Sequence, residues 1–427
     1  MNGRVHCGLI CLLATVLSNA QEKYDANKPL SAETILLARL RYIVAENMQR
    51  MPNYTCGMAI ERSVRSAKGR RFQLVDNLRL EVALAGGKEL YSWPGAEKFE
   101  ERDLTDMVSG GAIGTGDFAL HVKSIYVSNS AQFTYAGKEV LNGIEAQSFR
   151  FEIPRSMSGY SFRVGPAEGI VGYKGQVWHN AESLDLMRIE IDVHDIPQHV
   201  PIARGQSTID YARVRIGESD FTLPRNATIV LTDHTGGESR NHVVFTNCRQ
   251  FAGESTLRFD DPDPALLEPV TAAPVTVTLP AGLDVALRLK NAIDGTKAAV
   301  GDPFEATVSR DVKVKGQLVL PKGAMVSGRI RYINVGRTST PVHVIGLSVE
   351  RFAFENKKGA FHATLAEPVV LGRTSSRLAD RVPLNFREPE FKDPRVGVIY
   401  IVAPLFRLPS GFTANWRTLE SSGVQQQ

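Results

Sequence analysis

Residues 184–193 read LDLMRIEIDV, and this segment decides the fold class. From its fourth residue onward, apolar and charged side chains alternate without a break. The apolar positions are Met187, Ile189, Ile191 and Val193, and the charged positions between them are Arg188, Glu190 and Asp192. Successive residues of a β-strand point to opposite faces of the sheet. The segment therefore predicts a strand with one buried and one wet face, which is typical of an antiparallel sheet.

Two further segments repeat this pattern. FRFEI at 149–153 and YARVRI at 211–216 alternate in the same way, and turn-rich stretches such as WHNAE at 178–182 separate the strands at hairpin-like distances. We predict a mainly β (α+β) chain that begins with a long, twisted antiparallel sheet. With a wet outer face and an apolar inner face, this sheet has the form of a half-barrel.

One amphipathic helix precedes the sheet. Ser31 stands at a helix N-cap position, Glu33 places a negative charge in the first turn, and Pro52 ends the helix. One apolar stripe at helical spacing consists of Leu37, Leu40, Val44, Met48 and Met51. We expect this stripe to cover the inner face of the half-barrel.

The C-terminal part shows an internal repeat. LPAG at 279–282 recurs as LPKG at 320–323 and LPSG at 408–411. In each, proline presets φ and glycine is free to adopt a positive φ, which predicts a turn. The strands expected here are 284–289, 304–308, 325–333, 342–354 and 413–416. We predict a small closed or nearly closed β-barrel.

These patterns divide the chain into five parts. Prolines and acidic residues without period form a semi-rigid linker between the two β units. The predicted parts are a signal peptide at 1–20, the half-barrel at 31–260, the linker at 261–274, the small barrel at 275–417 and a tail at 418–427.

The first twenty residues have the features of an export signal. Arg4 precedes an apolar run over residues 8–17, and small residues at Ser18 and Ala20 predict cleavage before Gln21. An uncleaved anchor or a buried N-terminal strand is the alternative. No other segment approaches the ~18 apolar residues of a membrane span. We expect a periplasmic or secreted protein that is not integral to the membrane after cleavage.

Four cysteines become two when the signal is removed. Cys7 and Cys11 lie within it, which leaves Cys56 and Cys248 as a candidate disulfide closing a loop of 248 − 56 = 192 residues. Two separate buried thiols are the alternative. Because no CxxC occurs, the sequence supports neither a thioredoxin-like redox site nor a zinc ribbon.

Charge and composition are those of an ordinary globular protein. The 427 residues include 50 Lys+Arg and 46 Asp+Glu, a net charge of +4, with 43% hydrophobic and 22% charged residues. The small excess of positive charge gives no reason to expect nucleic acid as a partner.

No motif indicates catalysis. The glycine-rich segment GGAIGTG at 110–116 lacks the buried strand and the Gly-Lys-Ser/Thr of a phosphate-binding loop, so we expect a loop leading into a short helix near 118–125. His194, Asp195 and His199 form the densest group of metal-capable side chains, but Pro197 separates the histidines, and a polar loop is the better interpretation. We therefore predict a protein that is not an enzyme, with no catalytic residue, no metal and no cofactor; no ligand-binding residue is assigned.

The segment 31–260 resembles the LolA-like half-barrels of bacterial exported proteins, which include the sensor domain of RseB-type regulators. The resemblance lies in the helix 31–51, MPNYTC at 51–56, GQVW at 175–178 and the strand at 184–193. It implies an apolar concave face that holds a lipid or the acyl chains of a lipopeptide.

The segment 275–417 is similar to the small β-barrels of TrbI-type secretion scaffolds. VGDPF at 300–304 and LPKGA at 320–324, continuing to Gly328, carry this similarity. The long insertion that forms the membrane segment in channel proteins is missing, which argues against a pore.

Three functions remain open. The first is a non-enzymatic exported protein that binds an apolar ligand in the half-barrel. The second is a cell-envelope scaffold that docks a partner protein through the C-terminal barrel. The third is an unrecognised hydrolase, which requires a carboxylate or histidine cluster inside a cleft.

Overall fold

The structure is a computed structural model that describes part of the chain. The described residues are 29–86, 88–96, 99, 104–107, 119–250, 274–336, 341–372 and 393–420. The predicted signal peptide, nearly all of the predicted linker, the glycine-rich segment 110–116 and residues 421–427 of the tail lie outside them.

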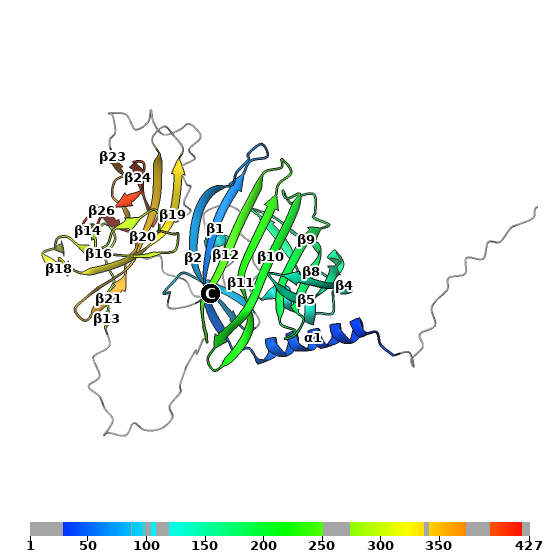
Figure 1. The fold of residues 1–427 in the computed structure, drawn as a ribbon. Helices are drawn as coiled ribbons and strands as arrows, with labels where there is room; N and C mark the ends of the chain where they lie inside the picture. The colour runs from blue at the N-terminus through cyan, green and yellow to red at the C-terminus, as the bar shows by residue number, and fades with distance from the viewer. Residues whose placement is uncertain are drawn as a thin grey trace, which may run out of the picture.

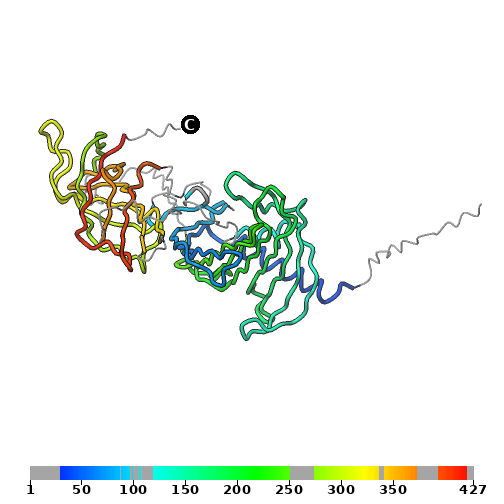
Figure 2. Tube along the Cα trace, turned by 90° about the horizontal axis from the view of Figure 1, so that it is seen from above, coloured from blue at the N-terminus to red at the C-terminus, as the bar shows by residue number. Residues whose placement is uncertain are grey.

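A ten-stranded antiparallel sheet forms the N-terminal part, and it curls around its own inner face as a half-barrel (Figures 1 and 2). Its strand order is β3-β2-β1-β12-β11-β10-β9-β8-β5-β4. The strands are β1 (Tyr54–Arg65), β2 (Gln73–Ala85), β3 (Lys88–Ser92), β4 (Gln132–Leu141), β5 (Ile144–Ile153), β8 (Gly172–Asn180), β9 (Leu186–His194), β10 (Arg204–Ile216), β11 (Ser219–Thr232) and β12 (Glu238–Gln250). The predicted fold class is confirmed.

Shorter elements connect these strands. They are α2 (Leu104–Met107), α3 (Leu120–Val122), η1 (Lys123–Val127), η2 (Arg155–Met157), and the two-stranded pair β6 (Ser161–Val164) and β7 (Ala167–Ile170). The short helix expected near 118–125 is present as α3 and η1. The turn expected at 178–182 was wrong in its first half, because Trp178 and His179 still belong to β8 and are buried.

Helix α1 (Ala32–Arg50) follows the sequence prediction closely. The Ser31 side chain accepts a hydrogen bond from the Thr34 backbone N–H, which caps the helix. Leu40 and Val44 are buried against inner-face side chains of β5, β8 and β9. Further along the helix, the Asn47 side chain pairs with the backbone of Thr222, donating to its carbonyl and accepting from its N–H, both at 3.3 Å.

The predicted disulfide is confirmed and joins neighbouring strands. Cys56 of β1 and Cys248 of β12 are bonded, with Cα atoms 4.1 Å apart. The pairing of β1 with β12 is interrupted at this point, because Cys56 alone faces the two residues Asn247 and Cys248. Such a bulge needs a residue with unusual backbone geometry, and Asn247 supplies it with a φ of +52°.

A second ten-stranded sheet forms the C-terminal part. Along its main path the order is β13-β21-β20-β19-β16-β14-β26-β22, and β24 pairs with β20 and β23. The strands are β13 (Val275–Thr276), β14 (Asp284–Leu289), β16 (Pro303–Val308), β19 (Met325–Gly336), β20 (Val342–Phe354), β21 (Lys357–Ala360), β22 (Ala363–Leu365), β23 (Val369–Gly372), β24 (Val396–Val402) and β26 (Thr413–Thr418). Two small pairs accompany them, β15 (Ile293–Asp294) with β25 (Arg407–Leu408) and β17 (Val312–Val314) with β18 (Gln317–Leu320).

This second sheet wraps around one apolar core. Side chains from β14, β16, β19, β20, β24 and β26 are buried together, and β22 lies against β24, which brings the ends of the sheet close to each other. The three Pro-x-Gly turns are confirmed, since Gly282, Gly323 and Gly411 all adopt positive φ. The predicted boundaries of the two domains stay a prediction.

The two sheets meet at an exposed edge of the first one. Strand β3 pairs with β2 only from Glu81 to Ala85, which leaves the preceding part of β2 without a partner on that side. Val300 forms a parallel bridge to Leu78 there, and its N–H and carbonyl bond to Asn77 and Arg79, both at 2.8 Å. An edge strand seeks backbone partners, and a loop of the second sheet provides them.

Side chains reinforce this junction, where β19 lies beside β2 (Figure 1). The Arg79 guanidinium bonds both carboxylate oxygens of Asp302 at 2.7 and 2.5 Å. Gly301 adopts a φ of +101°, and a Cβ atom there would lie 2.1 Å from the Arg79 carbonyl oxygen. Only glycine fits this approach of the two backbones.

Loss of the disulfide is expected to destabilise the chain. Because the bond closes a long loop, the Cys56→Ala/Cys248→Ala variant should lose about 2–5 kcal/mol of unfolding free energy. Denaturant unfolding with and without a reductant measures this. The reductant should destabilise the parent and leave the double variant unchanged; a parent that ignores the reductant would contradict the assignment.

The junction should be equally sensitive to a side chain at position 301. The side chain of Gly301→Val would clash with the Arg79 carbonyl oxygen, so this substitution is expected to separate the two sheets. The separation should increase the radius of gyration measured by small-angle X-ray scattering. Gly316→Val is the matched control, because Gly316 also has a positive φ of +82° but open space around it. Equal scattering from both variants would show that the junction does not hold the sheets together.

Candidate functional site

The inner face of the half-barrel is a continuous apolar surface. Strand alternation directs every second side chain of β1, β2, β10, β11 and β12 toward it. We call these side chains the inner-face cluster: Tyr54, Met58, Ile60, Leu78, Leu80, Val82, Ile209, Phe221, Leu223, Ala227, Val243 and Phe245. All of them are buried, so the inner face is covered by other parts of the chain.

The cover differs between the two ends of the sheet. Over β5, β8 and β9, helix α1 and the α3–η1 segment pack their apolar side chains onto the sheet. In the other core, which contains the side chains of β1, β2, β10, β11 and β12, Leu104 of α2 is a buried member and Met107 packs against it; α2 is a helix of a single turn. Leu104 is 0% exposed. Elements of the chain itself therefore fill the half-barrel. Among the described residues, one short helix, α2, contributes to the cover of the inner-face cluster.

A buried ion pair lies at one end of this apolar face. The Arg62 guanidinium donates to both oxygens of Asp76, from Nε at 2.7 Å and from Nη2 at 2.5 Å. The two residues are only 4% and 7% exposed, and Asn241 faces Arg62 on the neighbouring strand. Because the two charges of this buried pair neutralise each other, the pair places polar groups at the apolar face without leaving an unpaired charge there. It marks the end of the inner face opposite to the disulfide.

Two buried histidines lie where α3 and η1 pack on the sheet, His121 in α3 and His179 in β8. The backbone carbonyl of Leu184 can only accept a hydrogen bond, so His179 donates to it from Nδ1 at 3.0 Å. Its Nε2 then accepts from the Tyr126 hydroxyl at 2.7 Å. Burial lowers the pKa of His179 and of His121 to about 4, so both are neutral at pH 7. They hold α3 and η1 on the sheet as uncharged groups.

His194, the last residue of β9, and His199, in the segment that follows it, do not come together as a metal site. His194 contacts its neighbour Asp195 through Nδ1 at 2.9 Å, and His199 contacts the Glu168 carbonyl through Nε2 at 2.8 Å. Within the described ranges, no group of three or more His, Cys, Asp or Glu side chains is arranged to hold a metal ion.

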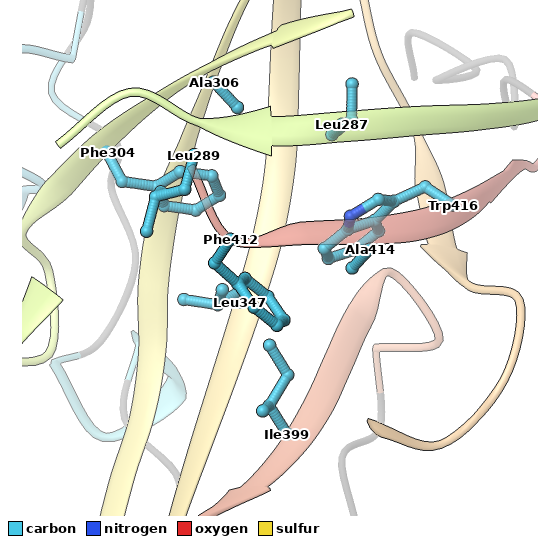
Figure 3. A pocket seen from close by; sticks show the side chains of 9 residues that line it. All are labelled: Leu287, Leu289, Phe304, Ala306, Leu347, Ile399, Phe412, Ala414 and Trp416. Carbon is cyan, nitrogen blue, oxygen red and sulfur yellow. The ribbon is translucent and has the colours of Figure 1, made fainter. Parts of the chain in front are cut away.

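The C-terminal core contains a small cavity (Figure 3). Its walls are the apolar side chains of Leu287, Leu289, Phe304, Ala306, Leu347, Ile399, Phe412, Ala414 and Trp416. The cavity measures about 20 Å³, which is room for about one water molecule. Ligand pockets are at least ten times larger, so this cavity belongs to the packing of the core.

Sequence reasoning did not find the residues that define this site. Arg62 and Asp76 occupy positions of β1 and β2 whose side chains alternate toward the inner face. The sequence could have indicated them as charged residues at positions that are otherwise apolar. Helix α2 gave no signal, because a four-residue helix has no periodicity. The disulfide was found because only two cysteines remained to be paired.

Comparisons with known proteins give only remote similarities. No protein-family model and no curated protein match the chain. Solved structures similar to it include a DUF1329 family protein from Desulfovibrio piger (10% identity, TM-score 0.30, covering 51% of this chain and 95% of the other). They also include a putative outer membrane lipoprotein-sorting protein domain from Vibrio parahaemolyticus (14%, 0.26, 52% and 95%) and a LolA superfamily protein from Nitrosomonas europaea (12%, 0.27, 52% and 95%).

These similarities cover about half of the chain, and the resemblance of the C-terminal part to TrbI-type barrels stays a prediction. TM-scores this low carry no conclusion about a ligand. Among the helices in the described ranges, none is both long and apolar enough to cross a membrane.

The buried histidines predict acid sensitivity. Each has a pKa of about 4 when folded and about 6.5 when unfolded, so the unfolded chain binds more protons between these values. Stability is therefore present above pH 6.5 and is lost as the pH falls toward 4, by on the order of 3 kcal/mol for each histidine. Urea unfolding at several pH values measures this loss.

The His179→Gln variant should lose about half of that pH dependence, because glutamine keeps both hydrogen bonds without binding a proton. His242→Gln is the control, since His242 is exposed on the outer face. A variant at position 179 with the full pH dependence of the parent would contradict the assignment.

Proposed function

We propose that this protein binds an apolar ligand, such as the acyl chain of a lipid or lipopeptide, between the inner-face cluster and helix α2. The observation that supports the proposal is the contrast between the large apolar inner face and the small helix that covers part of it. An inner face of twelve buried side chains is covered in part by a single helical turn that contributes Leu104 and Met107. The ligand would take the place of these two side chains.

The magnitudes favour such an exchange. Burying a leucine or methionine side chain contributes about 1.5–3 kcal/mol, so releasing both costs about 3–6 kcal/mol. An acyl chain of twelve carbons gains about 0.8 kcal/mol for each buried methylene, or roughly 9 kcal/mol in total. A helix of one turn also has little stability of its own. A chain of this length therefore outcompetes the cover, whereas a ligand of a few carbons does not.

The disulfide supports an exported location for this binding. Disulfides persist in the periplasm and outside the cell but are rare in the cytosol. The Cys56–Cys248 bond therefore agrees with the export signal predicted at residues 1–20. The alternative, a scaffold that docks an envelope protein through the C-terminal barrel, stays a prediction, and no contact described above favours it.

A bulky residue on the inner face should abolish binding. Ala227 is buried in the inner-face cluster, and Ala227→Phe fills the space that the ligand needs. Fluorescence titration with a lipid probe such as cis-parinaric acid is expected to show binding to the parent and none to this variant. Ala59→Phe is the matched control, because Ala59 lies exposed on the outer face of the same sheet.

Shortening the cover should have the opposite effect. Leu104→Ala removes a side chain that the ligand must displace, so the probe should bind about 10- to 100-fold more tightly. This variant keeps the test valid where the phenylalanine variant fails to fold. A parent that binds no probe, together with a Leu104→Ala variant that binds none, would refute the proposal.

A further inference from the structure

One tryptophan connects the inner face with a group of arginines on the second sheet. Trp93 directly follows β3 and packs against the buried core that contains the inner-face cluster. The Arg331 guanidinium lies over its ring, 4.9 Å from the ring centre. Arg331 belongs to β19 and is the extra residue of a bulge, since Ile330 and Tyr332 face consecutive residues of β20. A β-bulge changes the direction of a side chain, and such bulges are frequent next to active sites.

The carboxylates near Arg331 are engaged by other arginines. Glu350 accepts a hydrogen bond from the Arg329 Nε at 3.3 Å. Both oxygens of Asp393 accept from Arg395, at 2.8 and 2.7 Å. Among the described residues, Arg331 forms no hydrogen bond and no ion pair, and its one specific contact is the Trp93 ring.

Arg329 has a different part in the junction. Its Nη1 donates to the carbonyls of Pro94 and Gly301, at 3.0 and 2.7 Å, and so ties the second sheet to the chain that follows β3. Its donors are used for this connection. Among the described residues, this group thus has three guanidinium charges and two carboxylate charges, and Arg331 carries the excess positive charge.

The surroundings of Arg331 disfavour a charge without a partner. Burial lowers the pKa of Arg331, and the nearby charges of Arg329 and Arg395 act in the same direction, while Glu350 and Asp393 oppose it. A guanidinium nevertheless stays charged at neutral pH. A partly buried charge without a hydrogen-bonded partner is unfavourable, and an anion from outside the chain would supply that partner.

We propose that Arg331 binds the oxyanion headgroup, a carboxylate or phosphate, of the ligand whose apolar chain lies on the inner face. This inference rests on the proposed function. A guanidinium stacked on an aromatic ring keeps its N–H groups directed outward in its own plane, where they match the two oxygens of a carboxylate or phosphate. Trp93 lies under the Arg331 guanidinium and packs against the core that contains the inner-face cluster, so headgroup and chain would be bound near each other. The ligand is then an anionic amphiphile.

The test compares three ligands of equal chain length on the full chain: dodecanoic acid, dodecyl phosphate and 1-dodecanol. Displacement of a fluorescent lipid probe measures each affinity. One or both anionic ligands should bind the parent about tenfold or more tightly than the alcohol, and the preferred one identifies the headgroup. Arg331→Gln should remove this preference and leave the affinity for the alcohol unchanged.

Two controls make the result specific. Arg331→Lys keeps the charge and should retain part of the preference. Arg288→Gln removes an exposed arginine elsewhere on the second sheet and should change nothing. An undiminished preference in Arg331→Gln would overturn the headgroup site, while binding of the alcohol would still support the proposed function.

If none of the three ligands binds the parent, the proposed function is refuted, and so is the proposal that the ligand is an anionic amphiphile. Inorganic phosphate then decides whether Arg331 is an anion site at all. Phosphate should raise the melting temperature of the parent above that in chloride at equal ionic strength, and Arg331→Gln should abolish the rise. A parent without such a rise would overturn the anion site as well.

Discussion

The apolar inner face of the half-barrel must be buried, and this requirement determines where the helices and the second sheet lie. Strand alternation places a continuous row of large apolar side chains on the inner face of the half-barrel, and a ten-stranded open sheet cannot bury that face against itself. Helix α1, the α3–η1 segment and the single turn of α2 therefore lie on it. The same constraint acts at the edge, where Val300 of the second sheet completes the backbone pairing of β2 and adds its side chain, 2% exposed, to the same core. The cover is thus assembled from separate elements, and α2 is the shortest of those that are described.

Polar groups that enter this apolar region are satisfied in different ways. Arg62 and Asp76 neutralise each other, and His179 is uncharged and bonded at both ring nitrogens. Arg331 differs from these, because its charge lies over the Trp93 ring while the nearby carboxylates bond other arginines. Groups that satisfy each other stabilise the fold, whereas a charge without a hydrogen-bonded partner next to an apolar core is what an anionic amphiphile would recognise. The proposed ligand follows from this difference.

The sequence predicted those parts that local patterns determine. Alternation at 184–193 located β9, helical spacing with a capping serine located α1, and the Pro-x-Gly segments located three turns with positive φ at glycine. Long-range contacts had no such signal. The bridge between Leu78 and Val300 joins residues far apart in the chain, and nothing near either residue indicates it. His179 was assigned to the turn-rich stretch 178–182 between two strands; its burial depends on Tyr126 and on the Leu184 carbonyl, which only the folded chain brings to it.

Quenching of Trp93 fluorescence by a brominated fatty acid measures whether an acyl chain lies on the inner face. Trp93 packs against the inner-face cluster, whereas Trp178 bonds Glu139 and Trp416 lies in the core of the second sheet. Bromine atoms quench only a tryptophan that they approach closely. If the acyl chain lies on the inner face, 9,10-dibromostearate should quench the parent, and the Trp93→Phe variant should lose that quenching. Equal quenching in the two proteins, or none in the parent, would contradict binding at this face.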